Sequence, residues 1–281
     1  MKRSWWPVCL LVCVTGPLRA DSAQEVHDLF QKAAGALSDR KAPAFEAAFD
    51  FSQPGLGKLR ASVEALLKAS DIQSNIEWDK NEGDDQSRRV QLNWLLEITD
   101  RGGVGALTHR RARVECLLKK KGDAWRIVSF TPADFFAPSQ ADEAWGVVMT
   151  AALALTESAA SNPASNADAD MPAANTHKFL EAFDPAMPGY PQLKQSVLGL
   201  EQSADIESTV DLQQNEGDDR VRTLTVDWSM NLVSRETTVT MVQRRQTVTC
   251  KLEKQGKRWR ITALDPQTFF ASAGAGKTPN Y

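Results

Sequence analysis

The sequence predicts an α+β protein made of two copies of one domain, each with helices followed by a four-stranded antiparallel sheet. Three observations support this prediction: a duplication at a fixed spacing, helical periodicity at the start of each copy, and a two-residue alternation in the rest of it. The 281 residues are 42% hydrophobic and 25% charged. These values are typical of globular proteins, and the length is sufficient for two domains of ordinary size.

The duplication is visible as related segments that lie 134 residues apart. NEGDD occurs at 81–85 and again at 215–219, and WRI at 125–127 is repeated at 259–261. About a third of the positions from 45 to 136 are identical at this spacing, without a gap. A period this long indicates two copies of a whole domain rather than a solenoid. We expect one domain at 21–138, a second at 139–273 and a tail at 274–281.

Helices are predicted first in each copy. Val26, Leu29, Phe30, Ala33 and Leu37 have helical spacing, and a third helix follows the Pro54-Gly55 break. Upstream of position 45 the copies match at a shift near 119, so the second copy carries about 15 extra residues. The run ESAASNPASNADADMPAANTH at 157–177 lacks apolar residues for a core, and we expect a mobile loop there.

Strands are predicted after the helices, because the apolar period changes to two. The first copy alternates from Ile72, turns at NEGDD, and continues through Trp94. A third strand contains Val114 and Cys116, and a tight hairpin turn at Lys121-Gly122 leads to the last strand. A meander with one apolar face, covered by helices, gives an α+β fold.

This order of elements, with a G-x-W-R-I strand and a P-x-x-F-F tail, resembles the NTF2-like (SnoaL-like) superfamily of cone-shaped domains. The short strands that such domains often place between the helices are not evident in the sequence. The resemblance implies a cone whose interior can bind a ligand and a sheet that often mediates dimerisation. The tandem copies would then imitate that dimer within one chain, as an intramolecular pseudo-dimer.

The resemblance also extends to enzymes with this cone fold, such as ketosteroid isomerases and scytalone dehydratases. These enzymes place Asp, His or Tyr inside the cone, because proton transfer needs a titratable group beside the substrate. The inward positions of the predicted strands carry no Asp, Glu, His or Tyr in either copy. Strand parity does not apply to the helices, which are able to supply such a group. We therefore predict no catalytic residues on the strands.

Arginine is the polar exception that we identify on the inward faces. If Arg101-Gly102-Gly103 is the hairpin loop, Arg110 lies opposite Trp94 and Arg244 lies opposite Trp228. A stacked or salt-bridged arginine at the rim is the simpler interpretation, because burying an unpaired charge costs several kcal/mol. The alternative is an anion-binding site at the cone mouth made by these four residues.

Other motifs favour structural interpretations. NEGDD reads as a polar hairpin turn, with calcium binding as the weaker alternative. His27, His109 and His177 do not correspond between the copies, and no residue spacing suits zinc. We therefore expect no metal and no cofactor. Cys116 and Cys250 are predicted to be buried free thiols; a bridge between the copies is the alternative.

The first 20 residues, MKRSWWPVCLLVCVTGPLRA, read as a secretory signal peptide, because a basic start precedes a short apolar run and a small residue. A buried helix or a lipid anchor at Cys13 is less favoured. We expect a soluble periplasmic or extracellular protein with no membrane segment after cleavage. With 33 Lys and Arg against 36 Asp and Glu, the charge argues against a nucleic-acid partner.

Together these features predict an exported, non-catalytic binding or scaffold protein of unknown ligand. Its partner would be a small apolar or anionic molecule, or another protein. The alternative is an isomerase, dehydratase or hydrolase that uses one cone with acid and base groups from the helices or from the 157–177 segment.

Overall fold

The computed structural model describes residues 21–157, 174–235 and 241–271. The predicted signal peptide, the predicted tail and most of the predicted 157–177 loop lie outside these residues. Glu157 still belongs to a helix, and residues 174–177 already form the start of the next one. The predicted loop is therefore too long at both ends. Within the described residues, no helix is long and apolar enough to cross a membrane.

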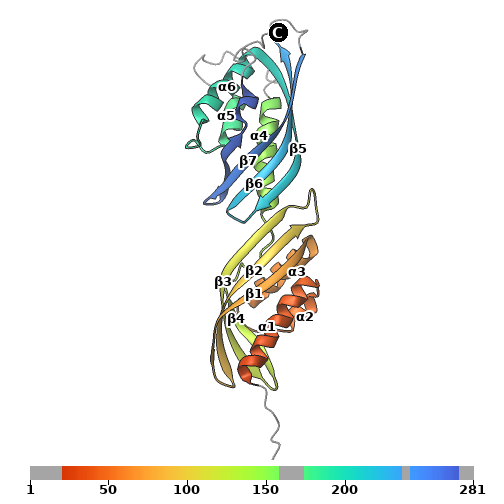
Figure 1. The fold of residues 1–281 in the computed structure, drawn as a ribbon, viewed down its shortest axis with the longest axis vertical. Coiled ribbons are helices and arrows are strands. Elements are labelled where there is room, and N and C mark those ends of the chain that lie inside the picture. The colour runs from red at the N-terminus through yellow and green to blue at the C-terminus, as the bar shows by residue number, and fades with distance from the viewer. Residues whose placement is uncertain (1–20, 158–173, 236–240, 272–281) are drawn as a thin grey trace, which may run out of the picture.

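Each copy consists of helices followed by a four-stranded antiparallel meander, as predicted. The first copy contains α1 (Ser22–Ser38), α2 (Ala42–Glu46), α3 (Leu56–Ala69), β1 (Ser70–Gly83), β2 (Ser87–Asp100), β3 (Leu107–Lys121) and β4 (Ala124–Thr131). The second contains α4 (Ala141–Glu157), α5 (Ala174–Glu181), α6 (Tyr190–Ser203), β5 (Ala204–Gly217), β6 (Val221–Ser234), β7 (Met241–Gln255), β8 (Arg258–Asp265) and the 3₁₀-helix η2 (Gln267–Phe270). In both, the helices cover the concave face of the curved sheet, and the copies lie end to end in an elongated molecule (Figure 1).

Strand pairing repeats in the two copies with the 134-residue spacing. Ser70 pairs with Asp100 at the start of β1–β2, and Ala204 pairs with Ser234 at the start of β5–β6. Even the irregularity after Trp78 recurs after Leu212. Equal register over this length places the same side chains inward in both copies.

The first helix of each copy, α1 or α4, aligns with the other at a shift of 118 residues, one residue less than the shift of about 119 predicted from the sequence. The Ser38 hydroxyl accepts from the Ser74 backbone N–H, and the Thr156 hydroxyl accepts in the same way from Ser208. Asn81 and Asn215 likewise donate to the carbonyl groups of Ala23 and Ala141. Apolar character alone does not fix this shift, because a slip of one residue still leaves apolar residues of the two helices opposite each other.

The β1–β2 and β5–β6 turns are formed by the two NEGDD segments. Gly83 has φ of 141°, and a Cβ there would lie 2.2 Å from the Ser87 carbonyl oxygen. Asp84 Oδ1 accepts the backbone N–H groups of Gln86 and Ser87, each at 2.8 Å. These bonds hold the pKa of Asp84 below its usual value. The prediction of a polar hairpin turn is confirmed.

A short strand segment between the helices escaped the sequence analysis. Phe49 forms a parallel bridge with Ile127, and Phe183 forms the same bridge with Ile261. Asp50 N–H donates to the Ile127 carbonyl at 2.9 Å, and Ile127 N–H donates to the Ala48 carbonyl at 2.8 Å. A bridge of one residue pair leaves no alternation to detect.

The hydrophobic core is divided into two clusters. One runs from Val26 to Phe136 and the other from Ala144 to Phe270. Trp94 and Trp228 are the largest fully buried side chains, one in each cluster. Cys116 and Cys250 are buried free thiols, one in each core, as predicted. Burial raises the pKa of Cys250 to about 12 and that of Cys116 still further.

The two copies do not stack their sheets face to face, as a pseudo-dimer formed through the sheets would require. They are joined end to end by a short parallel ladder between β3 and β5, in which Leu107 pairs with Glu216 and Thr108 with Gly217. The β5–β6 turn of the second copy therefore lies against the start of β3, and this junction positions the candidate site.

Candidate functional site

The predicted pairing of Arg110 with Trp94 is wrong by two residues. Residues 101–106 form a longer loop between β2 and β3, because Thr99 pairs with Leu107. Arg110 therefore lies opposite Leu96, and Arg244 lies opposite Met230. The shift of two preserves the inward parity of both arginines but removes them from the indole rings.

Trp94 and Trp228 are core residues and do not line an open cone mouth. Both are 0% exposed. The Trp94 indole N–H donates to Ser74 Oγ at 2.8 Å, and Trp228 donates to Ser208 Oγ at 2.9 Å. Neighbouring phenylalanine rings surround Trp94 with centroids 5.3 to 6.5 Å away. The serines satisfy the only polar atom of each indole, so these residues need no ligand.

Arg110 is a salt-bridged arginine at the junction of the copies. Its Nη1 donates to the carbonyl oxygens of Phe135 at 2.6 Å and Ala137 at 2.8 Å. Its Nε donates to Asp219 Oδ2 at 2.7 Å, and its side chain is 10% exposed. The first copy thus uses Arg110 to hold both its own C-terminal segment and the turn of the second copy.

Arg244 repeats only the first half of this arrangement. Its Nη1 donates to the carbonyl oxygens of Phe269 and Ala271, the equivalents of Phe135 and Ala137. Within the described part of the chain no carboxylate pairs with it. Partial burial lowers its pKa through desolvation, although an arginine stays charged at neutral pH.

Arg222 is the central junction residue that the sequence analysis missed. It is 0% exposed and donates to Asn215 Oδ1, to Thr108 Oγ1 at 2.8 Å and to the Leu107 carbonyl at 2.9 Å. Desolvation lowers its pKa, and Asp219 opposes the shift. Arg88 is the equivalent residue in the first copy and donates to Ser22 Oγ instead. Both arginines have the inward parity of Val90 and Leu224, so the alternation pointed to them at the strand ends.

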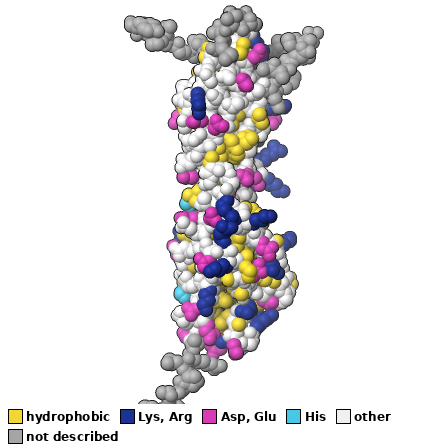
Figure 2. All heavy atoms as spheres, turned by 90° about the vertical axis from the view of Figure 1, so that its right-hand side faces the viewer, with side chains coloured by type: hydrophobic (Ala, Val, Ile, Leu, Met, Phe, Trp, Pro, Cys, Tyr) yellow, Lys and Arg dark blue, Asp and Glu magenta, His cyan; other side chains and the backbone are white. Residues whose placement is uncertain are grey.

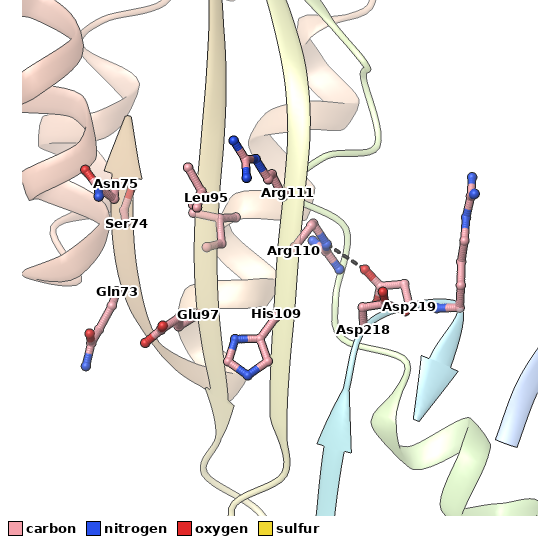
Figure 3. Close-up of a pocket in the computed structure, with 12 residues that line it drawn as sticks. Gln73, Ser74, Asn75, Leu95, Glu97, His109, Arg110, Arg111, Asp218 and Asp219 are labelled. Atoms are coloured by element: carbon pink, nitrogen blue, oxygen red, sulfur yellow. Dashed lines mark hydrogen bonds and ion pairs between the residues drawn. The ribbon is translucent and has the colours of Figure 1, made fainter. Parts of the chain in front are cut away.

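A depression of about 860 Å³ lies beside this junction. It is lined by the side chains of β1, β2 and β3 of the first copy and by the β5–β6 turn of the second. Gln73, Glu97 and His109 cross the three strands in a row, and Arg110 reaches over to Asp219 (Figure 3). Arg111 at its rim pairs with Glu77 at 2.8 Å. The depression therefore presents both charge signs and is open to the outside of the cone.

The histidines and acidic groups do not form a reaction centre among the described residues. His27 stacks on Trp78 with centroids 4.8 Å apart, whereas His109 is exposed on the outer face of β3. In the described ranges, no three His, Cys, Asp or Glu side chains are placed to hold a metal ion. In the NEGDD turns the first aspartate, Asp84 or Asp218, accepts backbone N–H groups.

Helices on the concave face of a curved, four-stranded antiparallel meander, present in both copies with matching register, decide the fold. Both copies have the helix-covered, curved-sheet α+β fold that the resemblance to NTF2-like domains implies. Similar solved structures include a conserved protein from Planctomyces limnophilus, with TM-score 0.37 and 11% identity, covering 40% of this chain and 94% of that one. They also include a ketosteroid isomerase-like protein from Erwinia carotovora atroseptica, with TM-score 0.35 and 13% identity over 40% and 95% of the two chains.

An NTF2-like superfamily protein from Salmonella enterica is similar over 39% of this chain and 87% of its own, with TM-score 0.34 and 12% identity. Each match covers about 40% of the chain. At this identity the likeness concerns the fold alone. No family model and no curated protein matches the sequence.

Proposed function

We propose that this chain is an exported, non-catalytic binding or scaffold protein whose contacts are made by its outer surface. The observation that carries the proposal is the filling of both cone interiors. The inward positions are occupied mainly by buried aliphatic and aromatic side chains, and serines accept the indole N–H groups of the two largest, Trp94 and Trp228. Close-packed rings leave little room for a substrate between them.

The depression beside the junction is the surface that we assign to partner binding. His109 and Arg220 line it from the two domains, and both are exposed. Its lining includes carboxylates (Glu97, Asp218, Asp219), arginines (Arg110, Arg111, Arg220) and leucines (Leu95, Leu96). Basic and acidic side chains are also interspersed with apolar atoms on the face of the molecule drawn in Figure 2. A surface of mixed charge and exposed apolar atoms suits a protein partner better than a small apolar ligand.

Export rests on residues 1–20, whose basic start, apolar run and final small residue form a signal-peptide pattern. The test of export is the N-terminal residue of the purified protein. Cleavage near Ala20 in the periplasmic or secreted fraction would support it, and a chain that keeps Met1 and remains in the cytoplasm would contradict it.

One observation favours the enzymatic alternative. Glu201 on α6 is 4% exposed and accepts from the Thr176 hydroxyl, while its Oε1 is buried without a hydrogen-bond partner. Burial raises its pKa above the usual value. A general acid or base needs such a group, but within the described residues no second titratable side chain hydrogen-bonds to it.

Native mass spectrometry of the protein purified from its exported fraction tests the binding proposal. We expect a heteromeric protein complex, weakened by the charge reversal Arg220→Glu and unchanged by Arg258→Ala, which alters an exposed arginine on β8. A small molecule retained at a fixed stoichiometry, with no protein partner, would contradict the proposal and favour a cone cavity.

A further inference from the structure

The duplication leaves one arginine and one aspartate of the junction without their counterparts. Arg110 of the first domain binds Asp219 in the β5–β6 turn of the second. The equivalent residues at the 134-residue spacing are Arg244 and Asp85. Neither has an ion-pair partner among the described residues, although each belongs to a segment that folds like its counterpart.

The β1–β2 turn of the first domain has the same form as the β5–β6 turn that carries Asp219. The β1–β2 turn has the sequence NEGDD, as does the β5–β6 turn. In each, the first aspartate caps two backbone N–H groups, at 2.8 Å in one turn and 2.7 Å in the other. Gly83 and Gly217 have φ values of 141° and 145°. Asp85 is therefore presented by the same backbone that presents Asp219.

Arg244 and the start of β7 in the second domain form the surface equivalent to the one that binds Asp219 in the first domain. Arg244 is held in place by the carbonyl oxygens of Phe269 and Ala271, as Arg110 is by those of Phe135 and Ala137. The Nε group that Arg110 uses for the ion pair has no partner in Arg244 within the described residues. Val242 next to it is 38% exposed, whereas the equivalent Thr108 is 0% exposed because the second domain covers it.

The two unused surfaces lie at opposite ends of an elongated molecule. The β1–β2 turn lies at the free end of the first domain, and the start of β7 lies at the free end of the second (Figure 1). Two different surfaces at opposite ends make a head-to-tail contact, which repeats without closing if the rotation does not form a ring.

We propose that a second copy of this chain docks its β1–β2 turn, through Asp85, on Arg244 and the start of β7, so that the chains associate head to tail. This association repeats the contact between the two domains of one chain. It stands independently of the partner-binding function proposed above.

The contact between chains is weaker than the contact within a chain. Within the chain, Arg222 donates to the Thr108 hydroxyl. Between chains the equivalent residues are Arg88 and Val242, and Val242 has no side-chain acceptor. Arg88 already donates to Ser22 Oγ of its own domain. The internal contact is also favoured by an effective concentration of about millimolar, because the domains are linked. Association is therefore expected to depend on concentration and to weaken with added salt.

Sedimentation equilibrium of the purified chain from micromolar to millimolar concentration tests the proposal. We expect the mean mass to rise with concentration and to stay at the monomer value in Arg244→Ala and in Asp85→Ala. An equimolar mixture of these two variants should form a dimer and nothing larger, because each retains one intact surface. Arg258→Ala and Asp211→Ala, which change exposed residues of β8 and β5, should associate like the native chain.

A native chain that stays monomeric up to millimolar concentration would overturn the proposal. Association that persists in Arg244→Ala and in Asp85→Ala would overturn it as well, because another surface would then hold the chains together. Circular dichroism of Arg244→Ala and of Asp85→Ala checks that both domains remain folded in each variant.

Discussion

At the scale of single residues, the arginine pair illustrates how the same side chain acquires two environments. Arg110 and Arg244 make equivalent bonds to backbone carbonyl groups, but only Arg110 has a carboxylate partner. Sequence parity was sufficient to place both on the inward face. It did not predict Asp219, because the contact depends on how two domains meet.

Arg110→Ala is expected to destabilise the chain by about 1–3 kcal/mol, because it removes two carbonyl bonds and leaves Asp219 partly buried and unpaired. Arg244→Ala is the matched control and should cost less, since it removes only the carbonyl bonds. Urea unfolding of both variants measures the difference. Equal losses would mean that the ion pair with Asp219 contributes nothing.

Glu201 is expected to reduce stability at neutral pH. Its pKa is raised in the folded state, so the folded protein favours the protonated form and loses stability as pH rises above the usual value of about 4.3. The first domain has Leu67 at this position and Ala42 in place of Thr176. Sequence comparison alone shows this difference but not the burial.

The double variant Glu201→Leu/Thr176→Ala installs the pair of the first domain in the second. We expect it to be more stable than the native chain by about 1–3 kcal/mol at pH 7, with the gap closing as pH falls toward 4. Unfolding free energies measured across this pH range provide the check. A gap that stays constant with pH would show that Glu201 is not the titrating group.

At the scale of elements, strands were predicted well because a two-residue alternation continues through most of β2 and through β1 as far as Trp78. The wrong predictions concern loop length and helix alignment, which the pattern of apolar side chains does not determine. The 101–106 loop is longer than the Arg-Gly-Gly turn suggested, and α4 is rich in small apolar residues, so a slip of one residue went unnoticed. The Phe49 bridge is too short to show any period.

Gly83→Ala is expected to destabilise the first domain by at least about 1–3 kcal/mol, since the left-handed φ and the Ser87 carbonyl both oppose a Cβ. Gly35→Ala in α1 is the control, because its Cβ would meet no atom within 4 Å. That change should stabilise by about 0.5–1 kcal/mol. Thermal unfolding of both variants measures these effects, and a neutral Gly83→Ala would contradict the assigned turn geometry.

At the scale of the whole molecule, the sequence predicted two domains of the correct fold class but not how they are arranged. The junction depends on Arg222, which lies at a strand end next to the NEGDD turn and was not among the residues that the sequence singled out. Its burial requires Thr108 and Leu107 of the other domain. The site between domains is therefore visible only when both are placed in space.

The packing of the two cone interiors distinguishes a protein that binds partners on its surface from one that binds small molecules in its cavities. If the aromatic rings fill both cones, an apolar molecule has no place to bind in the native chain. Removal of one ring by Phe136→Ala should cost about 3–5 kcal/mol and open a dry cavity in the first domain. That variant is the positive control for ligand entry.

The most direct test of this account is a titration of the native chain with benzene, followed by NMR shifts of the core methyl groups. We predict no saturable shift in the native chain and saturable binding in Phe136→Ala. Saturable binding of benzene by the native chain, with shifts confined to methyl groups inside either cone, would contradict the claim that the interiors are closed.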